Sequence, residues 1–231
     1  KRIISAVLGI VLAFTAFTIF VRRPKYRTIE PLSPRNESKT ILILGNSFVG
    51  TSQIGTFLKS MLDAAESEYS VEAVSRGYAT VTTYSSDVEL MNKIIDGEYC
   101  YVFQCGFYTD GDPDGYRLIR EACMLSHTGI AMLPAHNENT TLISMVHSDN
   151  KLDWQGEIND LLASGVSYDD MCLNDMHKHS KPLAGYVGAH MIYRNLFDSL
   201  PQGLTDDAPL DMEYIESKLG SYVTTGKVEK T

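Results

Sequence analysis

The residues best suited to chemistry are a serine near the start of the chain and a carboxylate with two imidazoles near its end. Ser47 follows a short apolar run, and Asp175, His177 and His179 share one polar loop. A serine hydroxyl becomes an effective nucleophile when an imidazole removes its proton and a carboxylate orients that imidazole. The two segments therefore contain the groups of a serine hydrolase, provided that the fold brings them together.

The elements around Ser47 predict where it lies. Residues 41–44 are a continuous apolar run that ends at Gly45, which is typical of a parallel strand buried on both faces. Residues 51–66 carry one apolar stripe at helical spacing and predict an amphipathic helix. In such a strand, turn and helix, Ser47 lies at the carboxyl edge of the sheet, where open α/β sheets bind their ligands.

The alternation of strand and helix continues along the chain. We predict further strands at residues 71–74, 99–105 and 130–133, and helices at 86–95, 116–124, 154–162 and from about 180 onward. Ser86 and Glu89 have the spacing of a capping box at the start of one helix. The pattern predicts an α/β fold, a three-layer α/β/α sandwich with a mostly parallel sheet.

Residues 41–48 resemble the first motif block of the SGNH (GDSL-like) hydrolases, an apolar strand followed by Gly-Asp/Asn-Ser. The last block of that family is an aspartate shortly before a histidine and a glycine-containing helix start, and Asp175, His179 and residues 185–189 are similar to it. The resemblance covers residues 40–200. It implies a flavodoxin-like sandwich that hydrolyses esters, lipids or acylated carbohydrates.

The spacing of the last block leaves the choice of base open between two histidines. The family pattern is Asp-x-x-His, whereas Asp175 stands two positions before His177 and four before His179. The distance to the Gly-Tyr segment that follows favours His179. We therefore expect Asp175 to orient His179, with His177 as the alternative base.

The resemblance also implies an oxyanion hole, which the family builds from a glycine after the second strand and an asparagine after the third. Gly77 matches the glycine by position. In place of the asparagine this sequence offers Gln104, which carries the same carboxamide donor on a longer arm. Asn46, next to the nucleophile, is the remaining candidate for substrate binding.

Composition excludes one class of partner and one class of site. The chain has 20 Lys and Arg against 29 Asp and Glu, a formal net charge of −9, so its surface repels a phosphate backbone and nucleic acid is not an expected partner. The four cysteines, at positions 100, 105, 123 and 172, form no CxxC pair and have apolar neighbours. They predict buried small residues rather than a zinc or redox site.

An uncharged apolar run at residues 3–21 lies between Lys1-Arg2 and Arg22-Arg23 and is long enough to span a bilayer. We predict a single transmembrane anchor over residues 1–23 and a proline-containing linker over 24–39. The folded domain follows at 40–200, and a polar C-terminal tail at 201–231. The count of basic residues places the domain in the cytoplasm, but the kind of domain favours the extracytoplasmic side.

The same residues are also compatible with two alternative kinds of site. Residues 45–52 have the Gly-x4-Gly spacing of a P-loop, but Thr51 replaces the lysine that contacts phosphate. His177 and His179 are spaced as metal ligands, with His136, His147 or Asp175 to complete a shell. No second cluster has ligand spacing, so a catalytic histidine is the preferred interpretation and no metal is expected there.

A third alternative is a calcium loop. Asp110, Asp112, Asp114 and Glu121 occupy positions 1, 3, 5 and 12 of the Ca²⁺-loop pattern, with Gly115 at position 6. The predicted strand before this loop, where the pattern has a helix, favours a solvated acidic turn.

The sequence therefore predicts a membrane-anchored serine esterase that needs no cofactor. By resemblance its substrate is an acylated small molecule, with an O-acyl group on carbohydrate as the expected class, and transfer of the acyl group to another acceptor would use the same residues. The alternative is a non-catalytic binding domain that keeps the SGNH-like fold, which the irregular Asp/His spacing and the missing asparagine favour.

Overall fold

The computed structural model describes residues 33–105, 113–134 and 150–228. Within these ranges no helix is long and apolar enough to cross a membrane. The predicted anchor at residues 1–23 and most of the predicted linker lie outside the described residues.

The described part of the chain contains a five-stranded sheet with all neighbours parallel, in the order β2-β1-β3-β4-β5. The strands are β1 (Thr40–Gly45), β2 (Ser70–Ser75), β3 (Tyr101–Cys105), β4 (Gly129–Leu133) and β5 (Asn150–Lys151). β1 and β3 lie in the middle and are apolar on both faces, because helices cover both sides. The predicted strands are confirmed, and β5 was not predicted.

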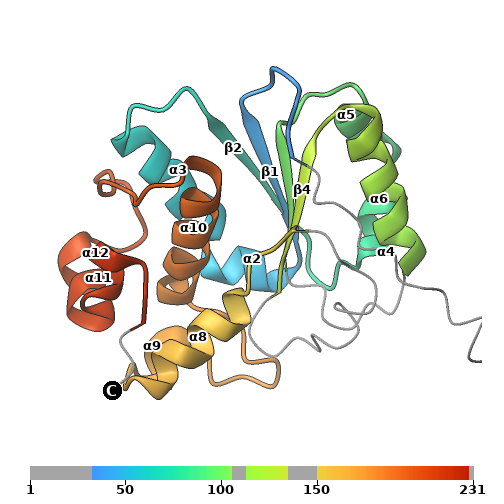
Figure 1. Cartoon of the computed structure of the whole chain (residues 1–231). Helices are drawn as coiled ribbons and strands as arrows, with labels where there is room; N and C mark the ends of the chain where they lie inside the picture. Colours follow the sequence, from blue (N-terminus) through green and yellow to red (C-terminus); the bar gives the residue numbers. More distant parts are fainter. Residues whose placement is uncertain (1–32, 106–112, 135–149, 229–231) are drawn as a thin grey trace, which may run out of the picture.

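Helices form a layer on each face of the sheet (Figure 1). One layer contains α2 (Ser47–Ser52), α3 (Ile54–Ala64), α8 (Trp154–Ala163), α9 (Tyr168–Met171) and α10 (Pro182–Phe197). The other contains α4 (Val81–Ser85), α5 (Val88–Ile95) and α6 (Pro113–Leu125). The three-layer α/β fold with a parallel sheet is therefore as predicted.

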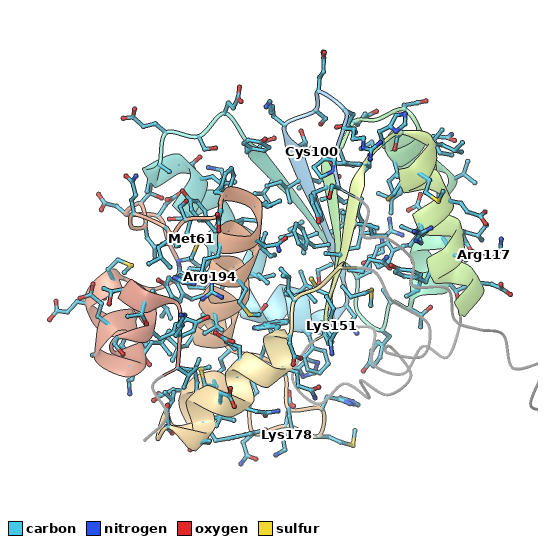
Figure 2. All side chains as sticks on the ribbon, in the orientation of Figure 1. Met61, Cys100, Arg117, Lys151, Lys178 and Arg194 are labelled. Atoms are coloured by element: carbon cyan, nitrogen blue, oxygen red, sulfur yellow. The ribbon has the colours of Figure 1, made fainter. Side chains whose placement is uncertain are left out.

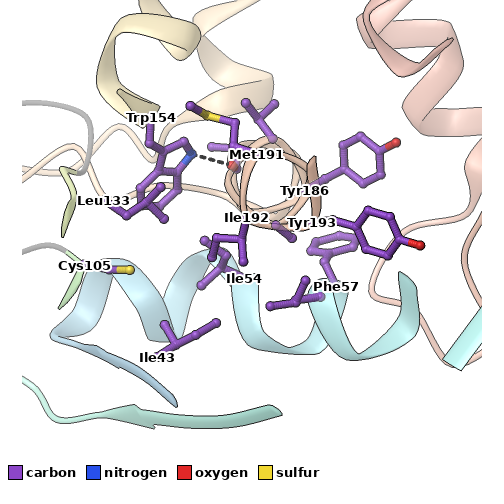
Figure 3. Close-up of a cluster of buried hydrophobic side chains, with 14 of the residues drawn as sticks. Ile43, Ile54, Phe57, Cys105, Leu133, Trp154, Tyr186, Met191, Ile192 and Tyr193 are labelled. Atoms are coloured by element: carbon purple, nitrogen blue, oxygen red, sulfur yellow. Dashed lines mark hydrogen bonds between the residues drawn. The ribbon is translucent and has the colours of Figure 1, made fainter. Parts of the chain in front are cut away.

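Helix α10 lies unusually close to its neighbours because glycines face them. A Cβ on Gly185 would lie 1.8 Å from the carbonyl oxygen of Ser52, and a Cβ on Gly188 would lie 2.5 Å from Ile54. The Trp154 indole Nε1–H donates a 2.8 Å hydrogen bond to the carbonyl oxygen of Ala184 (Figure 3). These contacts place the start of α10 against the end of α2.

The single helix predicted over residues 51–66 is instead two helices. α2 ends at Gln53, which has a left-handed φ of 57°, and α3 begins directly after it. Within α2 the Thr51 hydroxyl donates to the carbonyl oxygen of Ser47, and the Ser52 hydroxyl donates to that of Val49. Such side chains compete for the carbonyls that a continuing helix needs, which gives a physical reason for the break.

The predicted capping box of α5 is also wrong. The N-cap is Asp87, one residue after Ser86, and its carboxylate accepts from the Leu90 N–H at 3.1 Å. Ser86 is instead the C-cap of α4, where its backbone is helical and its N–H donates to the carbonyl oxygens of Thr82 and Tyr84, so it cannot adopt the extended backbone of an N-cap.

The C-terminal segment belongs to the folded domain rather than to a polar tail. It contains two helices, α11 (Met212–Leu219) and α12 (Tyr222–Thr225). Ile215, Leu219, Tyr222 and Val223 are buried in the same apolar cluster as α10. All four cysteines are buried and free, as expected of small core residues.

We expect Gly185→Ala to destabilise the fold by about 1–3 kcal/mol, because its methyl group must displace the backbone of Ser52. Gly203→Ala is the matched control, since a Cβ there meets nothing within 4 Å. Urea denaturation of the two variants measures the difference. Equal free energies of unfolding for the two would contradict the close packing of α10 on α2.

His190 gives the stability of the fold a specific dependence on pH. Its ring is fully buried between Tyr186 and Tyr222, and burial, with the charge of Arg194, lowers the pKa from 6.5 to about 4. Between these two values the unfolded chain binds more protons than the folded one, so stability falls as the pH is lowered. Below the folded-state pKa, protonation of His190 lowers the free energy of unfolding by about 3 kcal/mol in total.

Urea denaturation at pH 7.5 and 4.5 checks this expectation. The free energy of unfolding of the wild type should fall more steeply with acid than that of His190→Phe, which keeps a ring but cannot be protonated. An equal decrease in the free energy of unfolding of the two proteins would show that His190 is not responsible for the pH dependence.

Candidate active site

The structure joins Ser47, His179 and Asp175 in one hydrogen-bonded chain. The Ser47 Oγ lies 2.8 Å from His179 Nε2, and His179 Nδ1 lies 2.6 Å from Asp175 Oδ2. Ser47 and His179 are separated by 132 positions in the sequence. In such a series of hydrogen bonds, the imidazole can remove the hydroxyl proton while the carboxylate holds the other nitrogen of the ring.

The turn that carries Ser47 is built by its two preceding residues. A Cβ on Gly45 would lie 2.2 Å from Val49 and 2.6 Å from the carbonyl oxygen of Cys105, so only glycine fits between β1 and α2. The Asn46 side chain accepts a 3.0 Å hydrogen bond from the Phe48 N–H and caps α2. Ser47 is therefore the first residue of α2, held at the carboxyl end of a central strand.

The turn around Asp175 explains how its four-residue distance to His179 is accommodated. The Asp175 Oδ1 accepts from the backbone N–H groups of His177 and His179 at 3.1 and 3.2 Å, which leaves Oδ2 for the imidazole. Lys178, labelled in Figure 2, has a left-handed φ of 56° and reverses the chain. The loop closes where the Leu173 N–H donates to the carbonyl oxygen of His179 at 2.8 Å.

Electrostatics couple the carboxylate to the imidazole. The hydrogen bond from His179 holds the pKa of Asp175 below its ordinary value, although partial burial of the carboxylate opposes this shift through lost solvation. Asp175 is therefore ionised at neutral pH and orients His179. The Phe48 ring, 4.9 Å from the His179 ring between centroids, covers the imidazole.

His177 does not occupy the position of the base. Its ring contacts that of His179 edge-on, with centroids 5.6 Å apart, and lines the pocket beside it. The choice that the sequence left open is therefore decided by geometry in favour of His179 as the partner of Ser47.

A pocket of about 200 Å³ opens at Ser47. Its walls are residues 46–48, residues 77–80, His177 and His179. Gly77 faces open space, since a Cβ there would meet nothing within 4 Å. Gly77 and Asn46 thus lie where the sequence placed them, at the site.

Gln104 does not lie at the pocket. It is fully buried one residue before the end of β3, and it is not among the residues that line the site. Side chains alternate along a strand, so Gln104 shares a face with Val102, in the layer of α4 to α6. The predicted role of Gln104 as an oxyanion donor is therefore not supported, because its position has the wrong parity within β3.

The structure also bears on the metal alternatives. Within the described ranges no three His, Cys, Asp or Glu side chains are arranged to hold a metal ion. Asp110, Asp112, His136 and His147 lie outside the described residues. Asp114 and Glu121 lie on α6, where both pair with Arg117. This half of the predicted calcium loop is helical.

Comparisons with known proteins bear on the fold. No family model and no curated protein matches the chain. A DUF4886 family protein from Bacteroides uniformis has a similar structure, with a TM-score of 0.55 and 12% identity over 84% of this chain and 98% of that one. The psychrotrophic esterase EstA from Pseudoalteromonas sp., solved with monoethylphosphonate as its inhibitor, matches at 0.53 and 15% over 70% of this chain and 98% of that one.

A gut microbial diltiazem-metabolizing enzyme matches more weakly, with a TM-score of 0.45 and 13% identity over 71% of this chain and 48% of that one. At these identities the likeness shows the α/β fold alone. One of these structural neighbours is an esterase.

The hydrogen-bonded chain at Ser47 predicts a selectively reactive hydroxyl. An alkyl fluorophosphonate should react once per molecule, because the Ser47 oxygen attacks phosphorus, fluoride leaves and His179 takes the proton. Mass spectrometry of the intact protein and of its peptides locates the added group. Ser47→Ala and His179→Ala should remain unlabelled, and His177→Ala should label as the wild type does. Labelling spread over several serines would contradict the prediction.

Proposed function

We propose that this protein is a serine ester hydrolase that removes a small acyl group from an alcohol. The observation that carries the proposal is the hydrogen-bonded chain from Ser47 through His179 to Asp175 at the mouth of a pocket. The proposed roles are nucleophile for Ser47, general base and acid for His179, and orienting carboxylate for Asp175.

The proposed reaction proceeds in two halves. The Ser47 oxygen bonds to the ester carbonyl carbon while its proton passes to His179 Nε2, and that proton then goes to the departing alcohol as the carbon–oxygen bond breaks. Water attacks the acyl-enzyme, gives a proton to His179 and releases the carboxylic acid, after which the proton returns to Ser47. An acceptor alcohol in place of water would give acyl transfer with the same groups.

The backbone N–H groups of Ser47 and Gly77 are the proposed oxyanion donors. Ser47 begins a helix, so its N–H is not used by the helical hydrogen bonds that follow, and Gly77 also lines the pocket. Backbone donors of this kind stabilise the charge that develops on the carbonyl oxygen in the transition state. Gln104 faces the layer of α4 to α6, so we assign to these two N–H groups the role that the sequence predicted for the Gln104 side chain.

The lining and the volume of the pocket indicate which acyl groups it can bind. Of the described residues that line it, none is Asp, Glu, Lys or Arg, so a neutral acyl group is favoured. A volume of about 200 Å³ suits a short acyl chain. By the family resemblance we propose an acylated carbohydrate as the natural substrate class, and by the apolar run at residues 3–21 a protein held at a membrane with this domain on the extracytoplasmic side.

Hydrolysis of p-nitrophenyl acetate by the full chain tests the proposal. Ser47→Ala and His179→Ala should each lower kcat by about 1000-fold or more, and Asp175→Asn by about 100-fold, because its carboxylate is partly exposed. His177→Ala is the matched control and should change kcat by less than about threefold. The Ser47-dependent activity should sediment with membranes and become soluble in detergent.

Folded wild-type protein without Ser47-dependent turnover on short acyl esters would overturn the proposal. The fold would then serve as a binding domain.

A further inference from the structure

The two loops that form the pocket each expose a large apolar side chain. Tyr78 is 91% exposed and Met176 is 87% exposed, more than the other large apolar side chains of the described residues. Tyr78 lines the pocket, and Met176 directly precedes His177, which lines it from the other loop. Side chains this exposed contribute little to the core. Tyr78 lies at the pocket and Met176 adjoins the pocket residue His177, so both side chains are available to a ligand that extends beyond the pocket.

The backbone of Tyr78 supports the same interpretation. Its φ of 58° lies in the left-handed region, which a bulky residue rarely adopts. Because the ring is almost fully exposed, packing within the free protein does not repay this strain. Strained residues of this kind are concentrated at sites that bind ligands.

The catalytic geometry decides which part of an ester meets these side chains. His179 Nε2 must reach both the Ser47 oxygen and the oxygen of the departing alcohol, so the alcohol lies on the side of the His179 loop. The inner wall of the pocket, where Phe48 and Ala79 are nearly buried, is left for the acyl group. The alcohol therefore extends outward, past the exposed side chains of Tyr78 and Met176, which we call the apolar rim.

We propose that Tyr78 and Met176 bind an apolar surface of the alcohol, such as the C–H face of a sugar ring or an alkyl chain, so that the preferred substrates are esters of a short, neutral acid with an alcohol that presents such a surface. The proposal rests on the proposed esterase activity of Ser47 and deepens it by naming the alcohol. Both residues are specificity-determining rather than catalytic, since neither contacts the reacting atoms.

Ethyl acetate and hexyl acetate test the proposal, because they share the acyl group and the chemistry of a primary alcohol and differ in four methylene groups. In wild-type protein kcat/KM should be about tenfold higher for hexyl acetate, as expected for partial burial of the added chain. Acid release at constant pH measures both rates.

Two variants remove the apolar rim without altering the backbone. Tyr78→Asn keeps a residue that tolerates the left-handed conformation, and Met176→Gln keeps the length of the side chain. Each should lower the ratio of kcat/KM for hexyl acetate to kcat/KM for ethyl acetate, and the double variant should bring this ratio to about one. Leu125→Gln, which changes an exposed apolar residue on α6, is the control and should leave the preference unchanged.

The possible outcomes distinguish the role of the apolar rim from the proposed esterase activity of Ser47. Ser47-dependent hydrolysis without a preference for hexyl acetate, or with a preference that the double variant retains, overturns the role of the rim and leaves the esterase standing. Absence of Ser47-dependent hydrolysis of either ester overturns both. Stronger competitive inhibition by 1-hexanol than by ethanol in wild type, lost in the variants, is an independent supporting result.

Discussion

The structure depends on the close approach of α10 to α2. Gly185 lies against the backbone of Ser52, and Trp154 donates to the carbonyl of Ala184, the residue before Gly185. His179 stands three residues before α10 begins, and Ser47 begins α2. One interhelical contact therefore sets the distance between two groups that are far apart in the sequence. A larger residue at position 185 would separate the helices and, with them, the Ser47 hydroxyl from the His179 ring.

Within that frame each group is positioned by short-range devices. Gly45 allows the chain to turn tightly after β1, and the Asn46 cap fixes the first turn of α2. Asp175 uses one oxygen to hold its own loop and the other to hold His179. The carboxylate is thus a structural acceptor and an orienting group at once, which explains why its pKa is lowered even though solvent reaches it.

In the proposed reaction, the position of His179 divides the ester between two parts of the site. We infer that the acyl group packs against the nearly buried Phe48 and Ala79, and that the alcohol leaves past the exposed Tyr78 and Met176. Ser47, His179 and Asp175 are joined by hydrogen bonds, whereas Tyr78 and Met176 are almost fully exposed, so these two exposed side chains can change without loss of the fold.

The sequence by itself determined what periodicity and local chemistry can determine. Apolar runs predicted the four main strands, helical stripes predicted most helices, and the position of Ser47 after the first strand predicted its place at the sheet edge. Only the tertiary structure chose His179 over His177, because a left-handed Lys178 turns one ring toward Ser47 and the other aside. It also removed Gln104 from the site and joined residues 201–228 to the core. Spacing along a chain gives distance in residues, and the direction of a side chain depends on strand parity and on turns that are stabilised by contacts with distant parts of the fold.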